Sequence, residues 1–167
     1  MATLLTNQPS SVRVEAITLG KVIDYSQEDP NDMGRAMAPA AYDTLLQHFQ
    51  DLKRSFQDYD LVVTGDLSTY GHQLLKEMLQ RQHINVEHYN DCGCLLYDMT
   101  TQEVFQGGSG CACSALVTMG YLYPLLKKKK YKRILVIATG ALLSPILSAQ
   151  KESIPCVAHA ISLEVVE

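Results

Sequence analysis

Two short apolar runs, each stopped by a glycine, constrain the fold of this chain more than any other feature. The first runs from Asp58 to Gly65 and the second from Arg133 to Gly140. A short apolar run that ends at a glycine predicts a buried strand. Strands that are apolar on both faces are typical of α/β proteins, in which helices cover both sides of the sheet.

The rest of the chain supplies further strands and helices in alternation. Residues 12–19 alternate between apolar and polar side chains, which predicts a strand that continues toward Ile23. Pro39 is expected to begin a helix, because the missing N–H of proline has no partner in a first turn. The predicted strands are residues 12–19, 58–65, 94–97, 133–140 and 157–166, and the predicted helices are residues 39–53, 71–82 and 111–128.

The order β-α-β-α-β-α-β-β predicts an α/β fold with a mostly buried mixed sheet and helices on both faces. The helix over residues 111–128 is apolar nearly all round, so we expect it to be buried. A chain of 167 residues fits one domain, which we place at residues 12–167 after a flexible arm of residues 1–11.

Composition and charge exclude several classes of protein. Apolar residues make up 47% of the chain and charged residues 19%, which excludes disorder as the main state. The net charge of -4 argues against nucleic acid as the main partner. No apolar run approaches the ~20 residues of a membrane helix, and no signal-peptide pattern follows Met1. We therefore expect a cytoplasmic protein that is not secreted.

The five cysteines are expected to be reduced thiols. Their number is odd, and four of them form the pairs Cys92/Cys94 and Cys111/Cys113. A single intervening residue makes tetrahedral closure around zinc awkward, so small buried side chains are the favoured interpretation and no metal site is predicted.

Three segments that follow strands or precede a helix are expected to meet at one edge of the sheet. They are residues 64–68, 107–111 and 139–145. Ligands of open α/β sheets bind beyond the carboxyl ends of the strands. The glycine-rich segment 107–111 would let a ligand approach the backbone, and the helix start after it would favour an anion. A turn that merely packs the helix on the sheet is the alternative.

Candidate catalytic groups are few. Cys111 or Cys113 at a helix start could have a lowered pKa, but a nucleophile also needs a base within reach. His48 and His83 are expected at helix surfaces or ends, and His159 is expected to be a structural histidine. No catalytic residue is predicted.

Four consecutive lysines, Lys127 to Lys130, end the third predicted helix. Cations at this position complement the helix dipole, so a solvated helix terminus is the favoured interpretation. The alternative is a patch that steers anions or contacts a membrane surface.

Several segments together resemble the stage V sporulation protein AD family, a thiolase-like family whose members carry two related halves. The resemblance covers the chain from about Val12 onward and identifies it as a C-terminal half. The segments that carry it are residues 31–41, 59–67, 89–93, 107–115, 133–135, 138–145 and 152–155.

The resemblance implies a role in sporulation and spore germination, through binding of dipicolinic acid (pyridine-2,6-dicarboxylate) and support of its uptake into the developing spore. The implied partners are the ligand, other proteins of the uptake complex, and a second thiolase-like half or a further copy in a homo-oligomer. The implied place in the spore is peripheral, at the inner membrane. The residues expected to bind the ligand are Gly65, Asp66, Gly108, Ser109, Gly110 and Cys111.

The departures from the active enzymes of the superfamily favour a non-catalytic protein. The His-Gln-Ala-Asn motif of ketoacyl synthase III is replaced by Gly65 to Ser68, and Ser109 stands where an asparagine is expected. The family's nucleophilic cysteine belongs to the other half. A degenerate or partner-dependent acyltransferase is the alternative.

Asp66 is the one acidic residue among the expected ligand contacts. Its charge would repel a bare dianion, so we expect it either to contact Ca²⁺ carried by the ligand or to cap the helix that follows it. No resident cofactor is expected.

Overall fold

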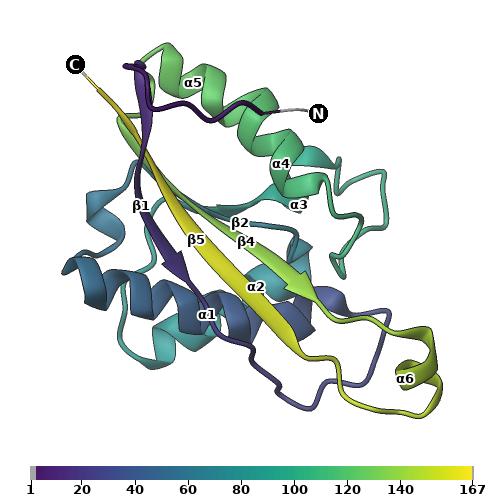
Figure 1. The fold of residues 1–167 in the computed structure, drawn as a ribbon. Coiled ribbons are helices and arrows are strands. Elements are labelled where there is room, and N and C mark those ends of the chain that lie inside the picture. The colour runs from purple at the N-terminus through teal and green to yellow at the C-terminus, as the bar shows by residue number, and fades with distance from the viewer. Residues whose placement is uncertain (1–2, 167) are drawn as a thin grey trace.

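A five-stranded mixed sheet in the order β1-β5-β4-β2-β3 forms the centre of the structure, a computed structural model that describes residues 3–166 (Figure 1). β2 pairs in parallel with β3 and β4, whereas β5 is antiparallel to β4 and β1. The predicted fold class is confirmed. The strands are β1 (Val12–Leu19), β2 (Leu61–Thr64), β3 (Tyr89–Asp91), β4 (Arg133–Ala141) and β5 (Cys156–Val165).

Helices cover both faces of this sheet (Figure 1). α1 and α2 lie on one face, and α3, α4 and α5 lie on the other. The helical elements are α1 (Met33–Leu52), the 3-10 turn η1 (Phe56–Asp58), α2 (Ser68–Arg81), α3 (Cys92–Leu96), α4 (Cys113–Val117), the π-turn η2 (Thr118–Leu122), α5 (Tyr123–Lys127) and α6 (Pro145–Ala149).

The apolar run of β4 is buried because successive side chains pack into the cores on opposite faces of the sheet. Leu135 and Ile137 belong to the core under α1 and α2. Ile134 and Val136 belong to the core under α4 and α5. Because strand side chains alternate between the two faces, a run with no polar position is what two covered faces require.

Three predicted element boundaries are wrong. The strand expected at 94–97 lies at Tyr89–Asp91 instead, and residues 92–96 are helical. α1 begins at Met33, where Asp32 accepts a hydrogen bond from the Arg35 N–H, so Pro39 lies inside the helix. β1 ends at Leu19, and Ile23 makes only an isolated bridge to Cys156.

The helix predicted at 111–128 is a continuous run of α4, η2 and α5, but it is buried on one side only. Leu122 and Leu126 are fully buried against the sheet, whereas Leu116 is 45% exposed and Tyr121 is 53% exposed. The expectation of a helix buried all round is therefore wrong. Its outer face lies open because no further layer covers it in this chain.

Backbone segments meet without side chains between them where α1 crosses α2. A Cβ atom built on Gly71 would lie 2.8 Å from the Cα of Gly34. The Gly34 N–H donates to the carbonyl of Gln106 at 2.5 Å, and the Tyr70 N–H donates to that of Phe105 at 3.0 Å. Both helices are thereby joined to the segment that leads into the glycine-rich loop.

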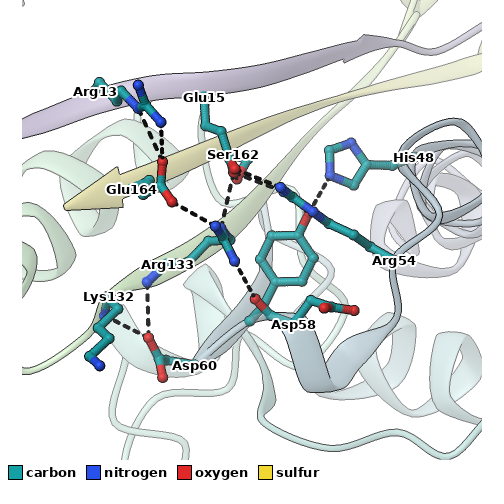
Figure 2. A network of polar contacts seen from close by, with 11 residues as sticks. Arg13, Glu15, His48, Arg54, Asp58, Asp60, Lys132, Arg133, Ser162 and Glu164 are labelled. Atoms are coloured by element: carbon teal, nitrogen blue, oxygen red, sulfur yellow. Dashed lines mark hydrogen bonds and ion pairs between the residues drawn. The ribbon is translucent and has the colours of Figure 1, made fainter. Parts of the chain in front are cut away.

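A network of charged side chains connects β1, β4 and β5 at the end of the sheet where β4 begins and β5 ends (Figure 2). Glu15 accepts hydrogen bonds from Arg54 at 2.6 and 2.8 Å, from Arg133 at 3.1 Å and from Ser162 at 2.8 Å. Arg133 also pairs with Glu164 at 2.6 Å. These contacts hold the pKa of Glu15 at about 2, below its usual 4.5, with the hydrogen bonds from Arg54 as the largest cause.

Within residues 3–166, no helix combines the length and the apolar character that crossing a bilayer requires.

Candidate functional site

The loop that follows β2 and the glycine-rich loop close on one carboxylate. Asp66 comes directly after the glycine that ends β2, and its side chain is buried. Its Oδ2 accepts hydrogen bonds from the N–H and the hydroxyl of Ser109, both at 2.6 Å. The Gly108 N–H donates to the main-chain carbonyl of Asp66 at 3.1 Å. Two of the three expected segments therefore meet here.

The third expected segment joins them through a threonine. A Cβ atom built on Gly65 would lie 2.6 Å from the Thr139 hydroxyl oxygen, so only a glycine allows β2 and β4 to lie so close here. That hydroxyl is buried and has no hydrogen-bond partner in the described residues. The Oδ1 atom of Asp66 is likewise buried and unpartnered. Two polar atoms with unused hydrogen-bonding capacity therefore flank Gly65.

The glycine-rich loop differs from an empty anion cradle. Asp66 already occupies the N–H groups of Gly108 and Ser109, because its carboxylate and carbonyl lie where a ligand carboxylate was expected. In the described part of the chain, the N–H groups of Gly110 and Cys111 have no acceptor, and both residues are exposed. The first two donors of the segment 108–111 are therefore engaged within the protein, and ligand binding by these residues stays a prediction.

Helix capping, the alternative role expected for Asp66, is performed by Asp91. This residue is fully buried at the end of β3. It accepts hydrogen bonds from the N–H groups of Leu67 and Ser68 at the start of α2, each at 2.9 Å. It also accepts from the Gly93 N–H at 2.9 Å and thereby caps α3.

Asp91 was not among the expected site residues. Aspartate is a favoured N-cap residue, so Asp91 is a signal for a helix start. The strand predicted at 94–97 was incompatible with a helix at that place, and the signal was therefore missed. Burial raises the pKa of Asp91 to about 6, and the hydrogen bonds from Thr64, Leu67 and Ser68 oppose that rise. The carboxyl group is therefore mostly ionised at neutral pH.

Three thiols around this edge, those of Cys92, Cys94 and Cys113, are poor nucleophiles. Burial raises the pKa of Cys113 to about 12 and that of Cys94 to about 11, and nearby carboxylates add to both shifts. Burial also raises the pKa of Cys92. Because the thiolate is the reactive form, these three groups are protonated and unreactive at neutral pH. All five cysteines are free thiols, and the absence of structural zinc stays a prediction.

The histidines occupy structural positions. His72 stacks on Tyr89 with ring centroids 4.3 Å apart, and burial lowers its pKa to about 4. His159 accepts from the Gly20 N–H at 3.1 Å, as its expected structural role requires. His83 is exposed just after α2, as expected. His48 was expected at a helix surface, but it is fully buried.

Replacing Ser109 with alanine is expected to lower the free energy of unfolding by about 1 kcal/mol, because one hydrogen bond to the Asp66 carboxylate disappears while the backbone donor remains. Urea denaturation measures the difference, and Ser109→Thr, which keeps the hydroxyl, serves as the control. An alanine variant as stable as the parent protein would show that the hydroxyl contributes nothing to this loop.

Comparisons with known proteins give a family match, a relative in sequence and a broad structural similarity. The family model described as Stage V sporulation protein AD matches residues 1–164. The chain is 48% identical over 164 residues to the stage V sporulation protein AD of Bacillus subtilis (strain 168), covering 98% of this chain and 48% of that protein. The chain thus spans about half the length of this relative. A broad structural similarity, with a TM-score of 0.48 and 11% identity, links 93% of this chain with 54% of 3-oxoacyl-[acyl-carrier-protein] synthase III from Aquifex aeolicus VF5.

Proposed function

The chain belongs to the stage V sporulation protein AD family, and from this membership we propose that it binds dipicolinic acid without catalysis and supports its uptake into the developing spore. The observation that carries the proposal is the enclosed Asp66 carboxylate at the carboxyl end of β2, beside the unoccupied N–H groups of Gly110 and Cys111. This edge offers separate places for a ligand carboxylate and for a cation.

Dipicolinate carries two carboxylates beside a ring nitrogen, and the two sides of this edge suit it in different ways. The N–H groups of Gly110 and Cys111 are donors for one carboxylate. The Asp66 Oδ1 atom would repel a bare dianion, but carboxylate oxygens are preferred ligands of Ca²⁺. In this proposal, Ca²⁺ enters only with the ligand and is not a resident metal of the protein.

The absence of catalysis is supported by the chemistry of the thiols. The pKa values of Cys94 and Cys113 lie far above neutral, and His72, the histidine nearest in sequence to Asp66, is half-buried and stacked on Tyr89. Acyl transfer needs a nucleophile, a base and an oxyanion donor together. Thioester exchange that depends on Cys111 or Cys113 would favour the alternative, a partner-dependent acyltransferase.

Calorimetric titration with dipicolinate, in the presence and absence of Ca²⁺, tests the proposal. Pyridine-3,5-dicarboxylate is the matched control, because it has the same charge but cannot present two carboxylates beside the ring nitrogen. We expect a binding heat with dipicolinate and none with the 3,5-isomer. Ca²⁺ is expected to increase the heat measured with dipicolinate. Equal heats from both isomers, or none from either, would contradict the proposal.

Replacing Gly110 with valine is expected to abolish dipicolinate binding while the protein still folds. A Cβ atom on Gly110 meets no atom within 4 Å, so the side chain would occupy the space through which the ligand approaches. The φ of Gly110 is +158°, so the valine also strains the backbone at this position, which is why the fold is checked alongside binding. Gly108 is a poorer position for this test, because its φ is +67° and its Cβ would lie 2.6 Å from the Cβ of Met33.

Thermal unfolding of the valine variant verifies the fold, and calorimetry reads the binding. A variant with glutamine at Lys127, Lys128 and Lys130 is the control for charge, since these lysines lie at the end of α5. If the valine variant folds and binds like the parent protein while the lysine variant loses binding, the ligand site lies on another surface.

The chain is further expected to associate, either with a second thiolase-like half or with a copy of itself. The outer face of the helix formed by α4, η2 and α5 exposes Ala112, Ala115, Leu116 and Tyr121. Monomers rarely expose large contiguous apolar patches, and a two-fold axis would bury this face twice. Light scattering at micromolar concentration is expected to give at least the mass of a dimer. A stable monomer that binds no apolar dye would contradict the prediction.

A further inference from the structure

The chain segment that follows α5 gathers positive charge on a protein whose net charge is -4. Residues 127–132, here termed the lysine turn, contain five lysines in six positions, and all five are exposed. Lys129 adopts a left-handed conformation with a φ of 55°. Its N–H donates to the Leu126 carbonyl at 2.8 Å, which ends the helix.

The acidic groups near the lysine turn make no ion pair with its ammonium groups in the described residues. The Oδ2 atom of Asp60 accepts from the backbone N–H groups of Lys132 and Arg133, at 2.6 and 2.9 Å. Glu164 pairs with Arg13 at 2.8 Å and with Arg133 at 2.6 Å. Across residues 3–166, no ion pair involves a lysine of the turn. The five ammonium groups therefore form a positive patch in which no described carboxylate is paired with a lysine.

The N-terminal arm starts beside this patch. The Val165 N–H donates to the carbonyl of Lys132 at 2.8 Å, and the Val166 N–H donates to that of Ser11 at 3.0 Å. Two apolar side chains further along the arm are among the most exposed large ones in the described chain, Leu4 at 90% and Leu5 at 78%. Seven residues of chain reach at most about 23 Å, so both leucines stay within range of the lysine turn.

We propose that the lysine turn and the leucines of the arm form a docking surface for a lipid bilayer that contains anionic headgroups. Each lysine near such a surface strengthens binding about fivefold. A polybasic patch and an apolar insertion are two signals of the kind that together give stable membrane attachment. The patch holds no arginine and only the half-buried Tyr131, so it offers little for stacking on nucleic-acid bases.

Co-sedimentation with vesicles of phosphatidylcholine, with and without phosphatidylglycerol, tests the proposal. The test variant carries glutamine at Lys127, Lys128 and Lys130. The matched control carries glutamine at Lys53, Arg81 and Lys151, which are also exposed, so both variants lose three positive charges. We expect the parent and the control to bind the anionic vesicles, and the test variant to bind them about 100-fold more weakly.

Salt and the arm give two further measurements. Raising the salt concentration should release the parent protein, because screening weakens attraction between exposed charges. Replacing Leu4 and Leu5 with serine should weaken binding without changing the salt dependence. Equal loss in the test and control variants, equal binding to neutral vesicles, or tighter binding to a single-stranded oligonucleotide at the same salt concentration would each overturn the proposal.

Discussion

Replacing Asp91 with alanine is expected to lower the free energy of unfolding by at least about 3 kcal/mol, since several buried donors would lose their acceptor at once. The carboxylate accepts from the Thr64 hydroxyl at 2.6 Å and from the N–H groups of Leu67, Ser68 and Gly93 at 2.9 Å each. Asp91 is fully buried, so bulk solvent does not replace the lost acceptor.

Asparagine at this position is expected to destabilise the protein nearly as much as alanine. Oδ1 of Asp91 accepts from Ser68 and Gly93, and Oδ2 accepts from Thr64 and Leu67, so an amide NH₂ in either orientation would face donors. Urea denaturation gives the midpoint and the slope. Asp98→Asn is the matched control at an exposed loop position. An Asp91→Asn variant within about 1 kcal/mol of the parent would contradict the assigned hydrogen bonds.

Replacing Glu15 with glutamine is expected to cost about 3 kcal/mol at neutral pH. The carboxylate lies between Arg54 and Arg133, and its side chain is 14% exposed. Its loss leaves the Arg54 guanidinium without an acidic partner in the described residues, and leaves Arg133 paired with Glu164 alone. The magnitude follows from a pKa lowered from 4.5 to about 2. Arg13→Gln, which removes an exposed partner of Glu164, is the control and is expected to cost no more than about 1 kcal/mol.

The pH dependence of this difference has a definite sign. The pKa of Glu15 is lower in the folded protein than in the unfolded chain, so the unfolded chain binds the proton more readily. The stabilisation is therefore complete above about pH 5 and is lost as the pH falls toward 2. Denaturation of parent and glutamine variants across this range should show the two converging in acid. A difference that stays constant with pH would exclude the ionised carboxylate as its source.

The central strands were predicted well from the sequence because burial alone determines their apolar pattern. β2 and β4 are apolar on both faces and end near glycines, so the apolar run itself specifies two covered faces. The third strand was misplaced because Cys94 to Tyr97 is as apolar as a strand. Its helical conformation is instead fixed by Asp91, whose carboxylate also binds residues that lie more than 20 positions away in the sequence.

Side-chain partners that are distant in sequence account for the other differences. His48 is buried because the Thr18 hydroxyl and the Tyr59 hydroxyl each lie 2.7 Å from one of its ring nitrogens. Spacing along a helix carries no information about either partner. The topology of the sheet predicted that the loops at Asp66 and Ser109 would lie close together. It did not predict that the Asp66 carboxylate would accept the hydrogen bonds of Ser109, because that depends on a few ångströms of backbone position.

The glycine contact between α1 and α2 couples parts of the molecule that the chain order keeps apart. The segment at Phe105 and Gln106 is bonded to these two helices, yet three residues later Ser109 holds the Asp66 carboxylate, and the chain then enters the opposite layer. Gly34 and Gly71 have no side chains, so the two helix backbones are in direct contact. A sliding of one helix along the other would therefore displace the segment at Phe105 and Gln106. The loop therefore connects the two layers through hydrogen bonds, and we expect a displacement of α1 or α2 to change the position of Ser109 relative to Asp66.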